Sequence, residues 1–421
     1  MSRAVLSPGT LRGELTVPPS KSAAHRALLC AALSGGRCRV RNLAPSEDIR
    51  ATADAVRAMG RRVEWDGGCL EIGPGAAPAR ADINCRESGS TLRFLIPVLS
   101  ALGIDASYTG EGRLPQRPIG CYLTCLPENG AVLETAGGLP LTVSGKLRAG
   151  TYRLPGDVSS QFITGLLLAL PLLSGDSDIV LTTPLESSGY VDMTLAVMED
   201  FGVAVTPTET GWHVPGGQRY LPRDYTVEGD WSQAAFFLAA GALGGELSLR
   251  GLRRDSRQGD RAAETLFSRF GAKLAWTGGV LTVSPGPLRG FSIDASQIPD
   301  LVPILAVTAA LSEGRTSILR AGRLRIKESD RLSAMAQGLS RLGARIEELP
   351  DGLEIDGVPA LSGGEVSGFR DHRVVMSLAV AALRAQGDVT VTDAESVSKS
   401  YPNFFQEYQK LGGIVNVINM G

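Results

Sequence analysis

Apolar residues along this chain gather in six helix-length runs that recur at roughly 70-residue intervals. The runs span residues 26–33, 92–102, 162–173, 234–243, 301–311 and 374–383. Each run is hydrophobic on all sides, whereas a surface helix would keep one polar face. The pattern therefore predicts six helices that are buried on every side, with sheets outside them.

The segments between these runs repeat one plan. After each run come a glycine and a short strand-like stretch, then a second, amphipathic helix that ends at a glycine, and then one more strand. The first strands are predicted at residues 37–40, 104–108, 178–181, 246–249, 316–319 and 388–391, and the helix-ending glycines are Gly60, Gly130, Gly202, Gly271, Gly343 and Gly412. A fixed period of this length indicates a duplicated supersecondary unit.

The domain organisation follows in part from the repeat. At 421 residues and 43% hydrophobic, the chain can bury a large core and is expected to form about two domains. Six repeats divide naturally into three and three, and residues 219–230, which are charged and contain a proline, are the candidate hinge. The first twenty residues precede the first buried helix, so the repeat alone lets them pair with either half.

Composition narrows the function. A formal net charge of −2 argues against a nucleic-acid partner held by bulk charge, so any anion site must be local. The first residues lack the apolar core of a signal peptide. The most hydrophobic stretch, 162–173, is too short to cross a bilayer and contains Pro171, so no membrane partner is expected.

Cysteine and histidine usage argues against a metal centre. The six cysteines lie between Cys30 and Cys125 without a CxxC pair, which favours buried, reduced thiols and a cytoplasmic location. Cys121 and Cys125 are four residues apart, but no histidine is near them in the sequence and the chain has three histidines in all. We therefore expect no metal.

The starts of the six buried helices carry the candidate chemistry, because a helix N-terminus has unpaired N–H groups and a partial positive charge that attract anions. These starts read Ser20-Lys21-Ser22, Ser88-Gly89-Ser90-Thr91, Ser159-Ser160-Gln161, Gly229-Asp230-Trp231-Ser232, Pro299-Asp300 and Asp371-His372-Arg373. Helix capping alone is the alternative for the serines and aspartates. It does not explain Lys21 and Arg373, since a cation at this end is unfavourable unless an anion joins it.

Further cations lie near these starts. Ser22 and Arg26 are four residues apart and share a helix face. In RLRIKESDRL, Lys327 and Arg331 are also four apart and Glu328 is three before Arg331, although an ordinary salt-bridged helix face would look the same. Arg117 and Lys399 lie at equivalent places in other units, and Arg93 lies inside an apolar helix, where an unpaired charge would be expensive. The set favours a substrate that carries phosphate and carboxylate groups.

Eight motifs in order resemble one family. They are PPSKSAAHRALL, SGSTLRF, RPIG, GDVSSQFITGLLLALPL, VEGDWSQAAFFLAA, RDSRQGD, RIKESDRL and DHRVVMSLAV. Along nearly its whole length the chain resembles the 5-enolpyruvylshikimate-3-phosphate synthases (3-phosphoshikimate 1-carboxyvinyltransferases).

The resemblance implies a fold and a reaction. The fold is a two-domain inside-out α/β barrel of six βαβαββ repeats, three per domain, with buried helices and outer sheets. Residues 1–19 join 229–421 in one domain, 20–228 form the inserted domain, and the active site lies in the interdomain cleft. The enzyme is expected to be a cytoplasmic monomer. It transfers the enolpyruvyl group of phosphoenolpyruvate to the 5-hydroxyl of shikimate 3-phosphate and releases phosphate, without cofactor or metal, on the pathway to chorismate and aromatic amino acids.

The resemblance also assigns residues. Those for shikimate 3-phosphate are Lys21, Ser22, Arg26, Ser159, Ser160, Gln161, Ser187, Tyr190, Asp300 and Lys327. Those for phosphoenolpyruvate are Lys21, Gly89, Arg117, Gln161, Arg331, Arg373 and Lys399. Asp300 and Glu328 are the acid–base candidates with Lys21 assisting, and His372 is a weaker one whose alternative role is to order Arg373. The reaction needs these types, because one carbon accepts a proton while a hydroxyl attacks its neighbour beside two anionic groups.

Three positions depart from the family pattern. Glu87 stands where many members have asparagine, Arg323 occupies an asparagine-like position near the shikimate phosphate site, and Phe94 replaces a proline. These changes bear on substrate affinity and on inhibition by glyphosate, which is expected to compete with phosphoenolpyruvate, more than on the reaction.

Two alternative functions share this fold. The first is the related UDP-N-acetylglucosamine enolpyruvyl transferase, which typically carries a reactive cysteine shortly before an RP dipeptide; the loop TGEGRLPQRPIG has none, and Cys121 follows the dipeptide. The second is a non-catalytic anion-binding protein of the same fold. The joint presence of Lys21, Asp300, Glu328, Arg331 and Arg373 argues against it.

Overall fold

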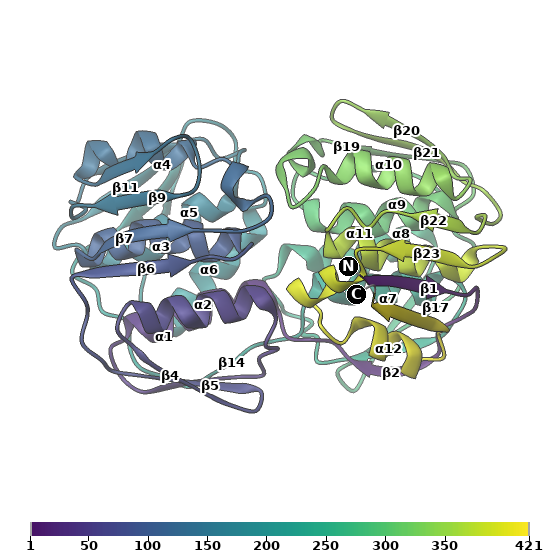
Figure 1. The fold of residues 1–421 in the computed structure, drawn as a ribbon, viewed down its shortest axis with the longest axis horizontal. Helices are drawn as coiled ribbons and strands as arrows, with labels where there is room; N and C mark the ends of the chain where they lie inside the picture. Colours follow the sequence, from purple (N-terminus) through teal and green to yellow (C-terminus); the bar gives the residue numbers. More distant parts are fainter. Residues whose placement is uncertain (1, 420–421) are drawn as a thin grey trace. The chain divides into compact units, whose positions relative to one another are not determined.

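The chain folds into two compact units that have the same plan (Figure 1). The computed structural model describes residues 2–419. One unit, here called the terminal unit, contains the residues up to Pro18 and those from Gly229 onward, and the other, the inserted unit, is Pro19–Glu228. Among the described residues, no helix is both long enough and apolar enough to span a bilayer.

The inserted unit has six α-helices and three four-stranded sheets. The helices are α1 (Lys21–Leu33), α2 (Glu47–Ala58), α3 (Gly89–Leu102), α4 (Gly120–Cys125), α5 (Ser160–Ala169) and α6 (Ser188–Asp200). The sheet orders are β14 (Tyr225–Thr226), β3 (Cys38–Arg41), β5 (Cys69–Gly73), β4 (Arg62–Asp66); β6 (Arg80–Asn84), β7 (Asp105–Thr109), β9 (Leu141–Ser144), β8 (Val132–Thr135); and β10 (Thr151–Leu154), β11 (Ser177–Leu181), β13 (Gly211–Val214), β12 (Thr206–Thr208). Short 3-10 turns are η1 (Leu114–Gln116), η2 (Pro127–Asn129) and η3 (Leu170–Leu172).

The terminal unit repeats this arrangement. Its helices are α7 (Trp231–Leu243), α8 (Ala262–Phe270), α9 (Val302–Ala310), α10 (Arg331–Arg341), α11 (His372–Ala381) and α12 (Phe404–Lys410). Its sheet orders are β2 (Gly13–Thr16), β15 (Leu247–Arg250), β17 (Val280–Ser284), β16 (Lys273–Thr277); β18 (Ser292–Asp294), β19 (Arg315–Leu319), β21 (Gly352–Asp356), β20 (Arg345–Leu349); and β22 (Gly364–Val366), β23 (Val389–Thr392), β1 (Ser2–Leu6), β24 (Val415–Asn419). Its 3-10 turns are η4 (Gly259–Arg261), η5 (Pro299–Leu301), η6 (Gly322–Ile326), η7 (Ala382–Arg384) and η8 (Ala394–Lys399).

The first strands of the chain pair within the terminal unit. Strand β2 runs parallel to β15, and β1 is antiparallel to both β23 and β24. Ser2 pairs with Asn419, so the two ends of the described chain lie side by side (Figure 1). The first strands, which the repeat alone could assign to either half, therefore pair with strands from the second half of the sequence.

The six apolar runs form inner helices, as predicted. All thirteen residues of α7 and all nine of α9 are buried. Two runs end as 3-10 turns. Helix α5 ends at Ala169 and continues as η3, because Pro171 has no N–H to continue the α-helical pattern, and α11 ends at Ala381 and continues as η7. The predicted fold class, mixed α/β with six four-stranded sheets in βαβαββ units, is confirmed.

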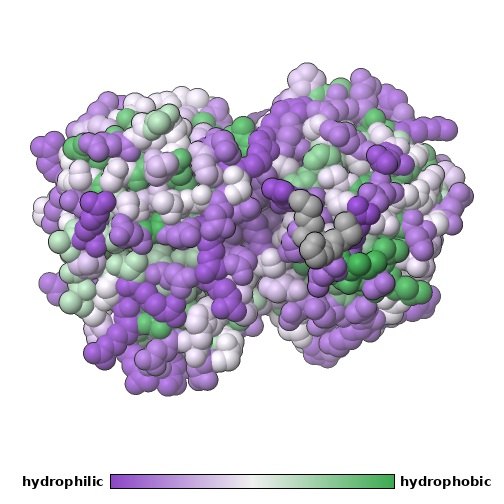
Figure 2. Space-filling model, in the orientation of Figure 1, coloured by the Kyte–Doolittle hydropathy of each residue, from purple (hydrophilic) through white to green (hydrophobic). Residues whose placement is uncertain are grey.

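Apolar side chains are gathered into two cores, one in each unit. The face of the molecule shown in Figure 2 is mostly hydrophilic, with hydrophobic residues in small groups.

Candidate active site

Helix capping accounts for the first polar residue of most inner helices. The N-cap side chains of Ser20, Ser88, Ser159, Asp230 and Asp371 each accept a hydrogen bond from a backbone N–H of their helix. The N-cap of α9 is Leu301, not Asp300. The capping interpretation therefore holds for these five residues, and the remaining side chains at the helix starts need another explanation.

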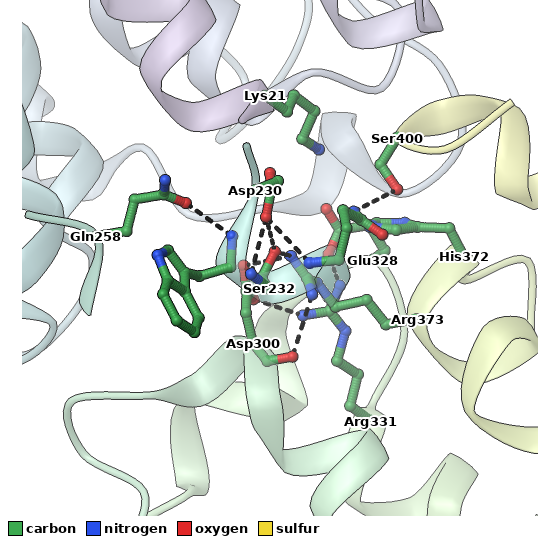
Figure 3. Close-up of polar contacts among 12 residues, drawn as sticks. Lys21, Asp230, Ser232, Gln258, Asp300, Glu328, Arg331, His372, Arg373 and Ser400 are labelled. Atoms are coloured by element: carbon green, nitrogen blue, oxygen red, sulfur yellow. Dashed lines mark hydrogen bonds and ion pairs between the residues drawn. The ribbon is translucent and has the colours of Figure 1, made fainter. Parts of the chain in front are cut away.

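Arg331 is the centre of a buried ionic cluster in the terminal unit (Figure 3). It is the first residue of α10, and its side chain is 2% exposed. Its guanidinium donates to Asp300 Oδ1 at 2.9 Å, to Glu328 Oε2 at 2.9 Å and to Asp371 Oδ2 at 2.8 Å. Burial alone would lower the pKa of Arg331, but the three carboxylates outweigh it and raise the pKa. The pair with Glu328 is therefore part of a buried network and not an exposed helix face.

Asp300 bridges two arginines. Its Oδ1 accepts from Arg331, while its Oδ2 accepts from Arg373 Nη2 at 2.9 Å. Arg373, the second residue of α11, also donates to Ser232 Oγ at 3.0 Å. Burial would raise the pKa of Asp300, but the charges of the two arginines and of Lys327 dominate and lower it. The Asp300 carboxylate is thus ionised and held where two guanidinium groups converge.

Two lysines lie beside this cluster. Lys399, the last residue of η8, has its Nζ 3.8 Å from Glu328 Oε1. Lys327 directly precedes Glu328, and burial lowers its pKa to about 8 even though Asp300 opposes that effect. Arg323, one of the departures from the family pattern, donates to the carbonyl of Ser296 at 2.7 Å and its charge adds to the lowering at Lys327. Lys327 can therefore lose its proton near neutral pH.

In the inserted unit, Lys21 opens α1 and forms an ion pair with Asp48 Oδ2 at 2.7 Å. This carboxylate, in the first turn of α2, is an anion that offsets the cost of a cation at a helix start. The residues Ser22, Ser160 and Tyr190 lie in the first turns of α1, α5 and α6.

Ser187 is the N-cap of α6 and is buried in the left-handed conformation, with φ 58°. A non-glycine residue in this region is strained, and such strain tends to persist where a site requires it.

A second cationic group forms around the start of α3. Arg93 donates to Gln161 Oε1 at 2.6 Å and to the Pro118 carbonyl at 2.9 Å. Gly89 lies against it: a Cβ there would come within 2.8 Å of Arg93 Nη1 and 3.0 Å of Arg117 Nη1. The missing side chain of Gly89 therefore lets two guanidinium groups approach the N-terminus of a helix.

Several contacts were not anticipated from the sequence. Asp48 is not among the predicted site residues, although its place in the first turn of a helix is a signal for a charge partner. The sequence indicates Asp371 only as part of a helix start, yet it both caps α11 and pairs with Arg331. Thr164 and Thr194, which bind Arg26, carry no sequence signal because they are 138 and 168 positions away from it.

The described residues contain no group of three His, Cys, Asp or Glu side chains arranged to hold a metal ion. Their polar groups converge instead as arginines and lysines facing carboxylates. Such a site can bind an anion and exchange protons through Asp300 and Glu328.

Comparison with known proteins identifies the family. The family model described as EPSP synthase (3-phosphoshikimate 1-carboxyvinyltransferase) matches residues 5–408. The 3-phosphoshikimate 1-carboxyvinyltransferase of Clostridium kluyveri is 43% identical over 420 residues, covering 99% of both chains, and that of Clostridioides difficile is 44% identical over 429 residues, covering 98% of both.

Solved structures agree. EPSP synthase from Acinetobacter baumannii superposes with a TM-score of 0.84 at 28% identity over the whole of both chains. The enolpyruvyl transferase NikO from Streptomyces tendae, at 19% identity and a TM-score of 0.81 over 100% of this chain and 99% of its own, shows the shared fold alone. The chain belongs to the EPSP synthase (3-phosphoshikimate 1-carboxyvinyltransferase) family.

Proposed function

We propose that the two cationic groups bind the substrates of the family reaction. The chain is a 3-phosphoshikimate 1-carboxyvinyltransferase of the shikimate pathway, which leads to the aromatic amino acids. The reaction moves the carboxyvinyl group of phosphoenolpyruvate to the 5-hydroxyl of shikimate 3-phosphate and releases phosphate. The observation that carries the assignment of the site is the Asp300 carboxylate bridging Arg331 and Arg373, since it shows that this pair already holds a carboxylate.

Most of the residues proposed for phosphoenolpyruvate are cationic. Arg331, Arg373 and Lys399 supply charge in the terminal unit, and Arg117 lies beside Gly89 in the inserted unit. Guanidinium groups suit carboxylates and phosphates because they donate two parallel hydrogen bonds. The full set proposed is Lys21, Gly89, Arg117, Gln161, Arg331, Arg373 and Lys399.

The residues for shikimate 3-phosphate combine hydroxyls with a few charges. They are Lys21, Ser22, Arg26, Ser159, Ser160, Gln161, Ser187, Tyr190, Asp300 and Lys327. Most lie at the starts of α1, α5 and α6, where backbone N–H groups add to the attraction for phosphate. Ser159 already caps α5 through its Oγ, so its hydroxyl is less available to bind a phosphate than that of Ser160.

The proton transfers are assigned to the carboxylates of the terminal unit. Asp300 takes the proton of the attacking 5-hydroxyl while Glu328 or Lys21 delivers a proton to the terminal carbon of phosphoenolpyruvate. When phosphate then leaves, that carbon returns a proton to the same group, which restores the vinyl double bond. The cationic surroundings favour charge that develops on the departing phosphate. His372, buried at the start of α11, remains the weaker candidate and is proposed only to order Arg373.

The proposed residues come from both units, so one reaction requires both units to reach the same substrates. Small-angle scattering tests this. The profile should contract when shikimate 3-phosphate and glyphosate are added together, and superimposable profiles would contradict a shared site.

The cellular location and the oligomeric state are proposed from the cysteines and from the two hydrophobic cores. All six cysteines are free thiols, a state that a reducing compartment preserves, which supports a cytoplasmic location. Each half of the chain forms its own hydrophobic core without a second chain, which supports a monomer.

Phosphate release provides the decisive assay. With phosphoenolpyruvate present, release should require shikimate 3-phosphate. Release with UDP-N-acetylglucosamine instead would indicate the related transferase, and no release with either acceptor would indicate a non-catalytic protein. The same assay with a chelator tests for a metal that the proposal does not include.

A further inference from the structure

Arg26 is a buried cation whose partners are neutral. It is 2% exposed, and burial lowers its pKa to about 10. Its guanidinium donates to the hydroxyl of Thr194 at 2.7 Å, to the carbonyls of Ser22 at 2.7 Å and Tyr190 at 2.9 Å, and to the hydroxyl of Thr164 at 3.3 Å. Within residues 2–419 no carboxylate pairs with it, in contrast to Arg331, which contacts three. A guanidinium in this setting is ready for an anionic ligand.

The ring of Phe94 contacts the same guanidinium. Phe94 is fully buried on α3, and Arg26 Cζ lies 5.2 Å from the centre of its ring. The ring of His25, the neighbour of Arg26 on α1, meets Phe94 edge-on at 6.4 Å and 88°. The face of an aromatic ring attracts a cation, more strongly where water is excluded.

A second arginine–phenylalanine contact of the same kind begins on the next inner helix. Arg93, on α3, lies with its Cζ 5.0 Å from the ring centre of Phe162 on α5. In both cases an arginine near the start of one inner helix lies against a phenylalanine of the next inner helix in the sequence. The same contact is therefore made at two successive inner helices of the inserted unit.

We propose that Phe94 is a positioning residue for shikimate 3-phosphate, and that it acts by holding the Arg26 guanidinium in place between α1 and α3. The inference rests on the proposed function, in which Arg26 binds that substrate. Hydrogen bonds at the edges of the guanidinium set its direction, and the ring limits its movement out of plane. Without the ring, the same bonds to neutral oxygens remain, but the cation loses its face contact and part of its order.

The test is Phe94→Leu, which removes the ring but keeps an apolar side chain. Shikimate 3-phosphate binding is measured by calorimetry, and KM for each substrate and kcat by phosphate release. The dissociation constant for shikimate 3-phosphate should rise by about three- to thirty-fold, the range expected for a desolvated cation–ring contact. The KM for phosphoenolpyruvate and kcat should change by less than about threefold. Phe94→Tyr keeps the ring face and should restore most of the affinity.

The matched control is Phe267→Leu. Phe267 is fully buried on α8 in the terminal unit, and its ring contact is with Phe270. Both leucine variants should lower the thermal midpoint, but the Phe267 variant should leave shikimate 3-phosphate affinity within about twofold of the parent chain.

A double-mutant cycle shows whether Phe94 acts through Arg26. In an Arg26→Lys background, which keeps the charge but not the planar guanidinium, adding Phe94→Leu should change the dissociation constant by less than about twofold. An unchanged loss in that background, or an unaltered affinity in the single variant, would overturn the proposal. If the unmodified chain itself fails to bind shikimate 3-phosphate, the proposed function fails and this inference falls with it.

Discussion

Replacing Asp300 with asparagine separates catalysis from binding at this site. In the structure the two oxygens of Asp300 accept hydrogen bonds from two different arginines, each at 2.9 Å. Asparagine keeps the size and one carbonyl oxygen, but it cannot take a proton from a substrate hydroxyl, and its NH₂ group would face a guanidinium donor. The change therefore removes the proposed base and loosens the bridge between Arg331 and Arg373.

The expected magnitudes differ for the two effects. Loss of general-base help costs roughly a hundred- to ten-thousand-fold in rate, so kcat should fall by that factor. Leaving a guanidinium hydrogen unpaired in a mostly buried site costs about 1–3 kcal/mol of folding stability. Binding of phosphoenolpyruvate should weaken little or tighten, because a negative charge has been removed from between the two arginines that hold it.

Steady-state phosphate release, calorimetric binding of each substrate and urea unfolding measure these three quantities. Asp330→Asn is the matched control, since Asp330 caps α10 through its Oδ1 and asparagine caps about as well as aspartate. Its turnover should stay near that of the parent chain. Turnover of the Asp300 variant within about threefold of the parent would refute the reasoning and leave Glu328 and Lys21 to carry the proton transfers.

Three further predictions concern neighbouring groups. Because burial lowers the pKa of Lys327 to about 8, the KM for shikimate 3-phosphate should be constant below that pH and rise above it as the lysine loses its proton; an arginine at this position should flatten the profile. Gly89→Ala should raise the KM for phosphoenolpyruvate and the inhibition constant of glyphosate, since the new methyl would press on Arg93 and Arg117; equal inhibition of both proteins would contradict this. Asp371→Ala should lower the free energy of unfolding by about 2–4 kcal/mol, because it removes one of the three carboxylates that pair with the buried Arg331 and uncaps α11; a loss below about 1 kcal/mol in urea unfolding would oppose that account.

The fold was predictable where the signal is local. Runs that are apolar on every side can only be buried, so the inner helices appeared within a few residues of their predicted places. Strand pairing is harder to predict from the sequence. Strand β14 supplies two residues to the first sheet by pairing Thr226 with Arg41, and nothing in either short segment indicates the other. Distant pairing of this kind depends on the folded arrangement and not on local pattern.

In the candidate site, too, local features are predictable from the sequence and distant contacts are not. Cations at helix starts were identified because a positive charge there needs an anion, a rule that applies to a single position. Glu328 is close enough to Arg331 in the sequence to be recognised as a partner, but Asp48 and Asp371 are not. Lys21 meets Asp48 across 27 positions, and Arg331 meets Asp371 across 40. In the sequence Phe94 stands out only as a departure from a family pattern, because its contact with the Arg26 guanidinium requires two helices to be packed.

The contacts of Asp300 also link binding to base strength. In this structure its pKa is lowered by Arg373 and Arg331, which makes the carboxylate a weak base. An anion that takes over both guanidinium groups withdraws part of their effect, so the pKa of Asp300 should rise when phosphoenolpyruvate is bound. The base must be deprotonated to act, so activity should increase with pH through this pKa. The acidic limb of kcat, which reports the substrate complex, should therefore lie at higher pH than the acidic limb of kcat/KM, which reports the free enzyme. Coincident limbs, or a kcat limb at lower pH, would show that Asp300 keeps its arginine contacts while substrate is bound.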